Sequence, residues 1–266
     1  MENNICISIS ETPGNFGKIV HNAGYKTLGL NWIYIPFKVT NLQDVIKGVR
    51  ALGIRGCSVS MPFKENVIKY LDEIEPMAKQ IGAVNTIVNE NGILKGYNTD
   101  YIGFKKSFEK LNVRKNQKLL ILGSGGVSKA ILAVLKNLKF KNILISGRNY
   151  SKTKQLAIKY DIDLIKWVRR EDNISEILIN ATPIGMKTNT NLMPVSKYFL
   201  KNFHGIFDVI VSPRETTLIK TAKSLKIVNQ SGYSMALNQA VAQFKLYTGK
   251  EVPIKAMEKA LKNYKI

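Results

Sequence analysis

The first sixty residues alternate between strand-like and helix-like patterning. Polar and apolar positions alternate over Asn4–Ser10, which predicts a strand, and apolar residues recur at helical spacing over Phe16–Leu28. The order continues with an expected strand, helix and strand over Asn31–Phe37, Val45–Leu52 and Gly56–Ser60. Strands that alternate with helices in this way favour a mostly parallel sheet in an α/β fold.

Over the next forty residues the regular alternation of strands and helices gives way to shorter elements and a hairpin. We expect two short helices, then a hairpin split by Asn91-Gly92, the dipeptide typical of a two-residue hairpin turn. Thr99 is the expected N-cap of a following helix, because its hydroxyl oxygen can accept an N–H of the first turn. The expected segments are helices at Lys64–Leu71 and Ile74–Gln80, strands at Val84–Val88 and Ile93–Gly96, and a helix at Asp100–Leu111.

A second strand–helix series begins after the polar segment Asn112–Gln117. Its expected strands are Leu119–Leu122, Asn142–Ser146, Ile177–Asn180 and Phe207–Val211, with helices at Gly126–Leu138, Met235–Thr248 and Ile254–Asn263. The polar segment between the two strand–helix series marks a boundary and predicts two α/β units.

Composition narrows the class of protein. The chain has 266 residues and a formal net charge of +21, yet its lysines are dispersed and no run of five basic residues occurs. Nucleic-acid binding is therefore disfavoured, although a positive field would attract anionic substrates and NADP. A polar start and the lack of a long apolar run predict a soluble, cytoplasmic protein that does not bind a membrane. Cys6 and Cys57 are expected to be buried thiols on strands, and no metal site is expected.

A glycine-rich turn follows the first strand of the second series. It reads Gly123-Ser124-Gly125-Gly126-Val127, and it is followed by Ser128 within the expected helix. The first glycine permits a tight turn, the second lets the backbone approach a pyrophosphate, and small Ser128 stands where a third glycine usually packs the helix on the strand. Free N–H groups of the helix N-terminus would face the phosphates. A turn that serves strand-to-helix geometry alone is the alternative.

The end of the next strand indicates which dinucleotide binds. Arg148 and Lys152 lie there, and the segment contains no carboxylate to accept from a ribose 2′-hydroxyl. Two cations favour a 2′-phosphate and hence NADP over NAD. Alternatively, both are solvated surface cations in a lysine-rich protein.

Two further segments each carry one group suited to proton transfer. Lys64 lies in Ser60-Met61-Pro62-Phe63-Lys64-Glu65, and Asp100 ends Tyr97-Asn98-Thr99-Asp100. A lysine can take the proton of a substrate hydroxyl or hold the developing oxyanion as hydride leaves the carbinol carbon. A neighbouring carboxylate can orient that lysine and bond a second hydroxyl. A structural ion pair at two helix starts is the alternative, and it is disfavoured because a helix N-terminus does not favour a cation.

With these motifs in place, the chain resembles the shikimate dehydrogenase family over nearly its whole length. The motifs that carry the resemblance are His21-Asn22, Ser60-x-Pro62-Phe63-Lys64-Glu65, Gly82-Ala83-Val84-Asn85-Thr86, Asn98-Thr99-Asp100, Gly123-x-Gly125-Gly126, Asn180-Ala181-Thr182 with Gly185-Met186, and Gln239 within Met235–Ala240. The resemblance implies an NADP-dependent oxidoreductase of aromatic amino acid biosynthesis, acting on a small anionic substrate as a monomer or homodimer. It also implies two domains: a substrate domain of residues 1–101 completed by helices in 235–266, and a Rossmann dinucleotide-binding domain of residues 102–234.

The resemblance also assigns roles to residues. Lys64 and Asp100 would flank the reacting hydroxyl, and Asn85 and Gln239 would bind ring hydroxyls, with Ser60 at a position usually held by threonine. Ala181, Thr182 and Met186 would border the nicotinamide ribose. His21 and His204 have no visible partner in the sequence, and we expect both to be structural.

This chain departs from the family pattern at the positions expected to bind the substrate carboxylate. A Ser-x-Ser pair usual in the family is replaced here by Asn15 and Gly17, and an expected tyrosine is Val211. Asn15 still offers an amide, and Gly17 offers its backbone N–H near a helix start. We therefore expect a divergent member that keeps the reaction machinery and acts on shikimate, quinate or a related cyclic polyol acid. A non-catalytic NADP-binding or sensing protein is the alternative, disfavoured because a binder has no need of the Lys64–Asp100 pair.

Overall fold

The computed structural model describes residues 4–186 and 190–262. The chain forms two compact units. The first runs up to Ile102 and includes the chain again from Gln239, and the second is Gly103–Asn238. The expected ranges, 1–101 with 235–266 and 102–234, remain our proposal for the functional domains.

The first unit is built on a six-stranded sheet in the order β2-β1-β3-β5-β6-β4. Its strands are β1 Asn4–Ser10, β2 Trp32–Lys38, β3 Gly56–Val59, β4 Glu73–Ile74, β5 Thr86–Glu90 and β6 Ile93–Tyr97. Strand β1 pairs in parallel with β2 and β3, whereas β5 pairs antiparallel with both β3 and β6. The hairpin prediction is confirmed, and the sheet is mixed rather than mostly parallel because that hairpin reverses the chain direction.

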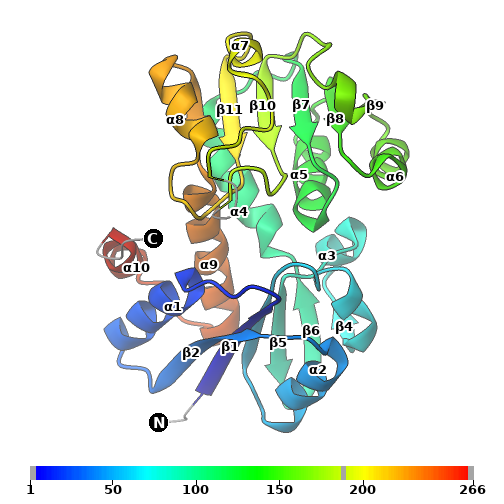
Figure 1. Ribbon diagram of the computed structural model, residues 1–266. Coiled ribbons are helices and arrows are strands. Elements are labelled where there is room, and N and C mark those ends of the chain that lie inside the picture. The colour runs from blue at the N-terminus through cyan, green and yellow to red at the C-terminus, as the bar shows by residue number, and fades with distance from the viewer. Residues whose placement is uncertain (1–3, 187–189, 263–266) are drawn as a thin grey trace. The chain divides into compact units, whose positions relative to one another are not determined.

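Helices cover both faces of this sheet. They are α1 Phe16–Thr27, α2 Leu42–Ala51, α3 Pro76–Ile81, the first turn of α4 Thr99–Phe108, the second half of α9 Gly232–Thr248, and α10 Ile254–Lys262. Apolar residues of α2 pack on β1 and β3 in one core, while Tyr25 of α1 and Phe244 of α9 lie in an aromatic cluster. Figure 1 shows α10, near the end of the chain, beside α1.

The second unit is built on a fully parallel six-stranded sheet in the order β12-β11-β10-β7-β8-β9. Its strands are β7 Leu119–Leu122, β8 Ile143–Ser146, β9 Asp163–Leu164, β10 Ile177–Asn180, β11 Gly205–Asp208 and β12 Val228–Gln230. Numbered from β7, this is the 3-2-1-4-5-6 order typical of dinucleotide-binding folds. All residues of β7, β8, β10 and β11 are buried, as expected for parallel strands covered on both faces.

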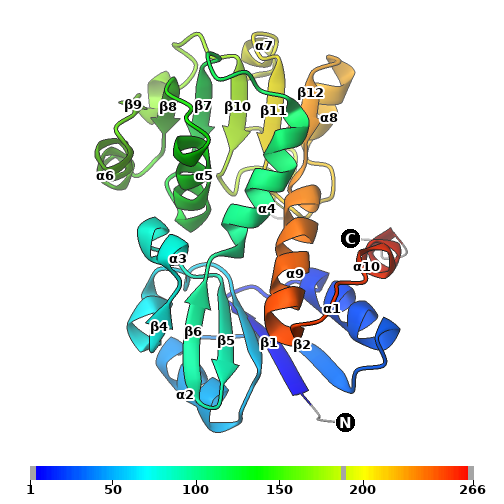
Figure 2. The ribbon, with the colours of Figure 1, turned by 180° about the vertical axis from the view of Figure 1, so that it is seen from behind.

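The second unit's helices flank the sheet, as Figures 1 and 2 show. They include α5 Gly126–Asn137, α6 Tyr150–Tyr160, α7 Lys197–Leu200 and α8 Thr217–Ser224, together with the rest of α4 and the first part of α9. Side chains of Asn149, Ser196 and Thr216 cap the N-termini of α6, α7 and α8. The two-unit α/β fold expected from the sequence is confirmed.

Several expected elements differ in detail. Residues 64–71 do not form one helix: a turn precedes the short 3₁₀ helix η1, Asn66–Tyr70, and Ile74 belongs to β4. The expected strand at Phe207–Val211 ends at Asp208, and the two short edge strands β9 and β12 were not predicted. The expected helix end at Asn263 lies outside the described residues. Helices at 150–160, 197–200 and 217–224 were also not predicted. The errors at β4, β9, β12 and η1 concern segments too short for a periodic pattern.

Thr99 is not the N-cap of α4, because it is already the first helical residue. The Asn98 Oδ1 atom accepts the Tyr101 N–H at 3.2 Å and so fills the capping role. Cys6 and Cys57 are buried free thiols on β1 and β3, as predicted. Within the described ranges, no helix is long and apolar enough to cross a membrane.

Candidate active site

Lys64 and Asp100 meet in the first unit as a buried ion pair. The Lys64 Nζ atom lies 2.6 Å from the Asp100 Oδ2 atom, with side chains only 10% and 3% exposed. Lys64 follows β3 in the turn before η1, and its carbonyl accepts the Val84 N–H at 2.8 Å. Two segments 36 residues apart therefore bring a cation and an anion together away from water.

The two members of this pair occupy different local settings. Asp100 is the second residue of α4, where the helix dipole favours a carboxylate. Lys64 does not open a helix as expected, because it lies two residues before η1. Because Lys64 is not at a helix N-terminus, the helix dipole gives no reason to disfavour a structural ion pair here, contrary to the expectation from the sequence. What stabilises the ammonium is the short charge-assisted bond to Asp100.

Asn85, one of the expected substrate-binding residues, is fully buried, and it accepts hydrogen bonds from Val59 of β3 and Thr99 of α4. Its Oδ1 atom accepts the backbone N–H of Thr99 at 2.7 Å, which fixes the orientation of the amide because only an oxygen can accept there. The Nδ2 atom then has no hydrogen-bond partner among the described residues. An unpaired buried donor costs about 1–3 kcal/mol, and Asn85 is bonded to Thr99, the residue before Asp100, so this donor indicates a ligand contact.

Other expected substrate residues also lie in the first unit. Ser60 follows β3 and is exposed, and Gln239 is half-buried on α9. Asn15 is the exposed N-cap residue of α1 and makes no side-chain capping bond. Gly17 lies in the first turn of that helix, where N–H groups lack an intrahelical acceptor.

Space at Gly17 is restricted by Tyr34 of β2. A Cβ atom at residue 17 would lie 2.9 Å from the Tyr34 Cε1 and Oη atoms, closer than ordinary contact. Tyr34 is held by Asn22, whose amide bonds both the N–H and the carbonyl of Tyr34, and by stacking on His21 with ring centroids 4.5 Å apart. A serine at position 17 would therefore require this ring to shift.

The two histidines differ. Burial lowers the pKa of His21 to about 3, so the ring is neutral and packs among aromatic side chains, as expected for a structural residue. His204 is exposed and does have a partner that the sequence did not reveal, since its Nδ1 atom lies 3.7 Å from the Glu176 Oε1 atom.

The glycine turn of the second unit joins β7 to α5 at the carboxyl edge of the sheet. Gly123 has φ +113°, and a Cβ atom on it would lie 2.6 Å from the Ala181 carbonyl oxygen, so the turn requires glycine. Gly125 precedes Gly126, the first residue of α5, and has open space around its Cα atom. Ser128, in the first turn of α5, is fully buried, in agreement with its expected packing role. This backbone suits the close approach of a pyrophosphate.

The two candidate 2′-phosphate ligands lie beside this turn. Arg148 follows β8 and is exposed, and Lys152 lies in the first turn of α6, half-buried. A Cβ atom on the adjacent Gly147 would approach the Ser124 hydroxyl to 3.2 Å, so the end of β8 and the glycine turn are neighbours. The donor set therefore fits an adenosine phosphate at this edge.

The loop after β10 contains the residues expected near the nicotinamide. The Thr182 N–H and hydroxyl both donate to the Asn180 Oδ1 atom, and Met186 is exposed after Gly185. Ala181 adjoins Gly123, and its N–H donates to the Leu122 carbonyl at 2.8 Å. Ala181 and Thr182 are therefore adjacent to the glycine turn.

A buried carboxylate that the sequence did not single out supports this loop. The Asp208 Oδ1 atom accepts from the Asn180 Nδ2 atom at 3.1 Å, and its Oδ2 atom accepts the Thr216 hydroxyl at 2.6 Å. Burial raises the pKa of Asp208 to about 6. Asp208 therefore ties β11 to the end of β10 and to the cap of α8.

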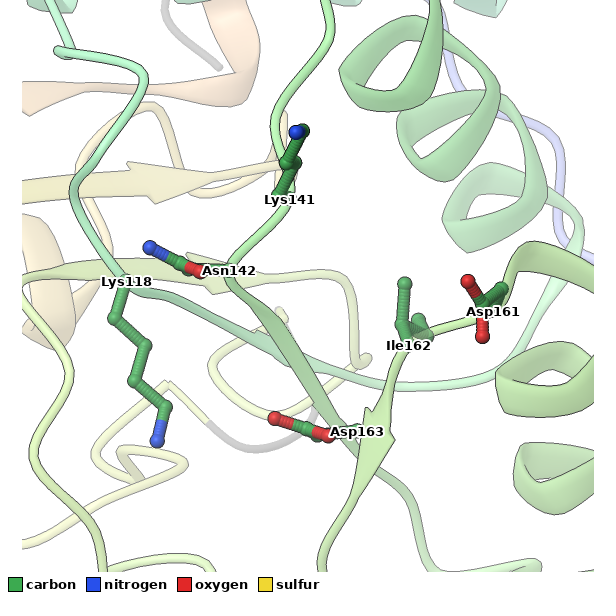
Figure 3. A pocket seen from close by; sticks show the side chains of 6 residues that line it. All are labelled: Lys118, Lys141, Asn142, Asp161, Ile162 and Asp163. Atoms are coloured by element: carbon green, nitrogen blue, oxygen red, sulfur yellow. The ribbon is translucent and has the colours of Figure 1, made fainter.

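A pocket of about 310 Å³ lies in the second unit away from these residues (Figure 3). Its lining comes from the segments that enter β7, β8 and β9, and thus from the amino ends of the strands: Lys118, Lys141, Asn142, Asp161, Ile162 and Asp163. Ligands of such sheets bind outside the carboxyl ends of the strands, so this hollow does not belong to the candidate site.

Three side chains that sequence reasoning missed complete the first unit's site. Gln243 of α9 and Thr86 of β5 both donate to Asn85, and Tyr34 of β2 packs closely against Gly17. Gln243 could have been found, because it lies four residues after Gln239 and therefore on the same face of α9.

Comparison with known proteins agrees with this geometry. Three family models match in chain order: a shikimate dehydrogenase substrate binding domain at residues 7–87, a shikimate/quinate 5-dehydrogenase model at 105–192, and a shikimate 5′-dehydrogenase C-terminal domain at 232–262. A shikimate dehydrogenase-like protein of Haemophilus influenzae is 46% identical, over 92% of this chain and 90% of its own length.

Two further relatives match over a similarly large share of the chain. A shikimate dehydrogenase (NADP⁺) of Caldanaerobacter subterraneus is 40% identical, over 87% of this chain and 86% of its own. A solved shikimate dehydrogenase in complex with NADP⁺ superposes with a TM-score of 0.88 at 35% identity, covering 98% of this chain and 95% of its own.

Proposed function

This chain belongs to the shikimate dehydrogenase family, and from that premise we propose that it is an NADP-dependent oxidoreductase. Its reaction interconverts a hydroxyl and a ketone on shikimate or a related cyclic polyol acid. The observation that carries the proposal is the buried Lys64–Asp100 pair. Beside it, Asn85 accepts the N–H of Thr99, the residue before Asp100, through its Oδ1 atom, while its Nδ2 donor has no partner among the described residues.

In the oxidation direction, the carbinol carbon loses a hydride and its hydroxyl loses a proton. NADP⁺, when bound, supplies the hydride acceptor. Lys64 Nζ takes the hydroxyl proton or holds the developing oxyanion, and Asp100 orients the lysine and bonds a neighbouring hydroxyl. In reduction the same groups return the proton. Asn85 and Gln239 orient the ring through its other hydroxyls.

The second unit holds the cofactor in this proposal. Residues from Gly123 to Val127 place backbone N–H groups of the α5 N-terminus against the pyrophosphate. Arg148 and Lys152 bind the 2′-phosphate, and Ala181, Thr182 and Met186 border the nicotinamide ribose. The open space around Gly125 and the lack of a carboxylate at the end of β8 support this assignment.

The carboxylate of the substrate is assigned to Asn15 and to the backbone at Gly17. Each charge-assisted bond lost relative to a serine hydroxyl would weaken binding by about 1.5–3 kcal/mol, so the physiological acid need not be shikimate. We further propose that the protein works in the cytoplasm, because its two free buried thiols suit a reducing compartment. We propose that it acts as a monomer or homodimer.

The test is a screen of NADP⁺ and NAD⁺ reduction against shikimate, quinate and related hydroxy acids. Turnover that requires Lys64 and prefers NADP⁺ is expected. Tight NADP binding with no turnover of any compound would instead support the non-catalytic sensor and overturn the proposed reaction.

A further inference from the structure

Gln243 connects helix α9 to residues beneath Asn85 in the candidate site, namely Ser58 of β3 and Thr86 of β5. Its side chain is buried, and its Nε2 atom lies 2.9 Å from the Thr86 Oγ1 atom, 3.1 Å from the Ser58 Oγ atom and 3.4 Å from the Asn85 carbonyl oxygen. A carbonyl only accepts, so these contacts establish that the amide nitrogen, and not its oxygen, faces the site.

This arrangement gives the hydrogen bonds a direction. Nε2 carries two hydrogens, and Thr86 Oγ1 at 2.9 Å is the nearest of its three neighbours, so the Thr86 hydroxyl accepts from it and turns its own hydrogen elsewhere. Its two available acceptors are the Asn85 Oδ1 atom at 2.9 Å and the Thr99 Oγ1 atom at 3.0 Å. Thr99 Oγ1 in turn lies 3.1 Å from the same Asn85 oxygen.

The Thr86 hydroxyl donates either to Asn85 Oδ1 directly or to Thr99 Oγ1, which then donates to Asn85 Oδ1. In both arrangements a hydroxyl hydrogen points at the Asn85 oxygen. Together with the Thr99 N–H, these donors hold the oxygen toward the protein and leave Nδ2 with both N–H groups unpaired within the described part of the chain. Reversal of the amide would set an NH₂ group against a backbone N–H and cost a buried unpaired donor.

We propose that Gln243 is a positioning residue for the substrate. Acting through Thr86, it holds the Asn85 amide with its nitrogen available to an oxygen acceptor of the substrate, so that it governs recognition of one ring hydroxyl without touching it. The reading of that acceptor as a ring hydroxyl rests on the proposed function.

The chain offers a matched set of variants for the test. Gln243→Met keeps the volume and removes the donors, while Gln243→Glu keeps the shape and reverses the polarity, because a carboxylate would accept the Thr86 hydroxyl hydrogen. Thr86→Val and Thr86→Ser form a second pair that removes or keeps the hydroxyl. This second pair serves if a Gln243 variant fails to fold, as judged by its thermal unfolding.

The measurement is KM and kcat for shikimate and for deoxy analogues that keep the reacting hydroxyl. Asn85→Ala first identifies the relevant analogue, the one whose KM this substitution leaves unchanged. Gln243→Met, Gln243→Glu and Thr86→Val should raise KM for shikimate about tenfold, change kcat less than threefold, and leave KM for that analogue unchanged. Thr86→Ser should restore the wild-type KM.

A second readout needs no turnover. The side-chain amide signals of Asn85 in ¹H–¹⁵N spectra of the unliganded protein should shift in Gln243→Met and in Thr86→Val, and return in Thr86→Ser. Absence of wild-type turnover would contradict the proposed function while these spectra still test the positioning role. Unchanged Asn85 signals, or an equal rise in KM for shikimate and the analogue, would overturn the inference.

Discussion

The two units build their candidate sites from different materials. In the first unit the functional atoms belong to buried side chains, Lys64, Asp100 and Asn85, each held by a specific partner. In the second unit they are backbone groups at Gly123–Gly126 together with an exposed Arg148. Chemistry needs fixed atoms in a dry setting, whereas binding of a phosphate needs N–H groups that a side chain would obstruct.

This difference predicts different sensitivities. The first unit should respond to loss of single polar atoms with little change in fold. The second should respond to the addition of a single methyl group, since its turn leaves no room at one glycine and open space at the next. Substitutions in one unit should leave the other unit's binding unchanged.

The largest effect is expected for Lys64→Ala. Loss of the proton-transfer group should lower kcat by about 10²–10⁴-fold, while the Kd for NADP stays within about twofold. Steady-state kinetics and calorimetric titration of the cofactor measure both. Asp100→Asn should also lower kcat, with part of the loss in KM. A Lys64→Ala enzyme near the wild-type rate would contradict the role of the pair.

Two glycines of the turn are expected to affect different properties, Gly123 the stability of the fold and Gly125 the binding of NADP. Gly123→Ala places a Cβ atom against the Ala181 carbonyl at a positive φ, so it should lower the free energy of unfolding by about 2–4 kcal/mol. Gly125→Ala should change stability by less than about 1 kcal/mol yet raise the Kd for NADP, because only the pyrophosphate meets the new methyl. Urea denaturation and cofactor titration would distinguish them. Equal loss of stability in both variants would contradict this division.

The buried carboxylate of the second unit predicts a pH dependence of stability. With its pKa raised to about 6, folded Asp208 keeps its proton in a range where the unfolded side chain has lost it. Its contribution to stability is therefore full below the unfolded pKa and is lost as pH rises through about 6. The free energy of unfolding of wild type relative to Asp208→Asn should fall by about 2 kcal/mol between pH 4 and pH 7. A pH-independent difference would show that the carboxylate titrates normally.

The smallest effect is expected at the exposed cation. Arg148→Ala should weaken NADP about tenfold and leave NAD unchanged, because only NADP carries the 2′-phosphate. Lys154→Ala, an exposed cation further along α6, is the matched control and should alter neither Kd. The preference for NADP should diminish as salt rises. Equal affinities of wild type for both cofactors would remove the basis of the assignment.

The sequence predicted most of the fold because its long strands and helices are periodic. It failed at short edge strands such as β9 and at the turn before η1, where too few residues show a period. The glycine turn and the Lys64–Asp100 pair were recognisable from local motifs. The spacing to Gln239 could have indicated Gln243, but not its contact with Ser58, 185 residues away. Tyr34 and Asp208 were not recognisable, because their roles depend on partners outside their own local motifs, such as Asn180 for Asp208.

The discontinuity of the first unit has a consequence for the order in which the protein matures. Synthesis proceeds from the amino end, so the continuous segment Gly103–Asn238 leaves the ribosome before the helical residues from Gln239 that include Gln243 and Phe244. Until those residues emerge, α1 lacks Phe244, and Thr86 lacks the donor that directs its hydroxyl. Limited proteolysis of ribosome-arrested chains should show protection over 103–238 before residues 4–98. A nascent chain can thus bind its cofactor before the part of the site that recognises the substrate is complete.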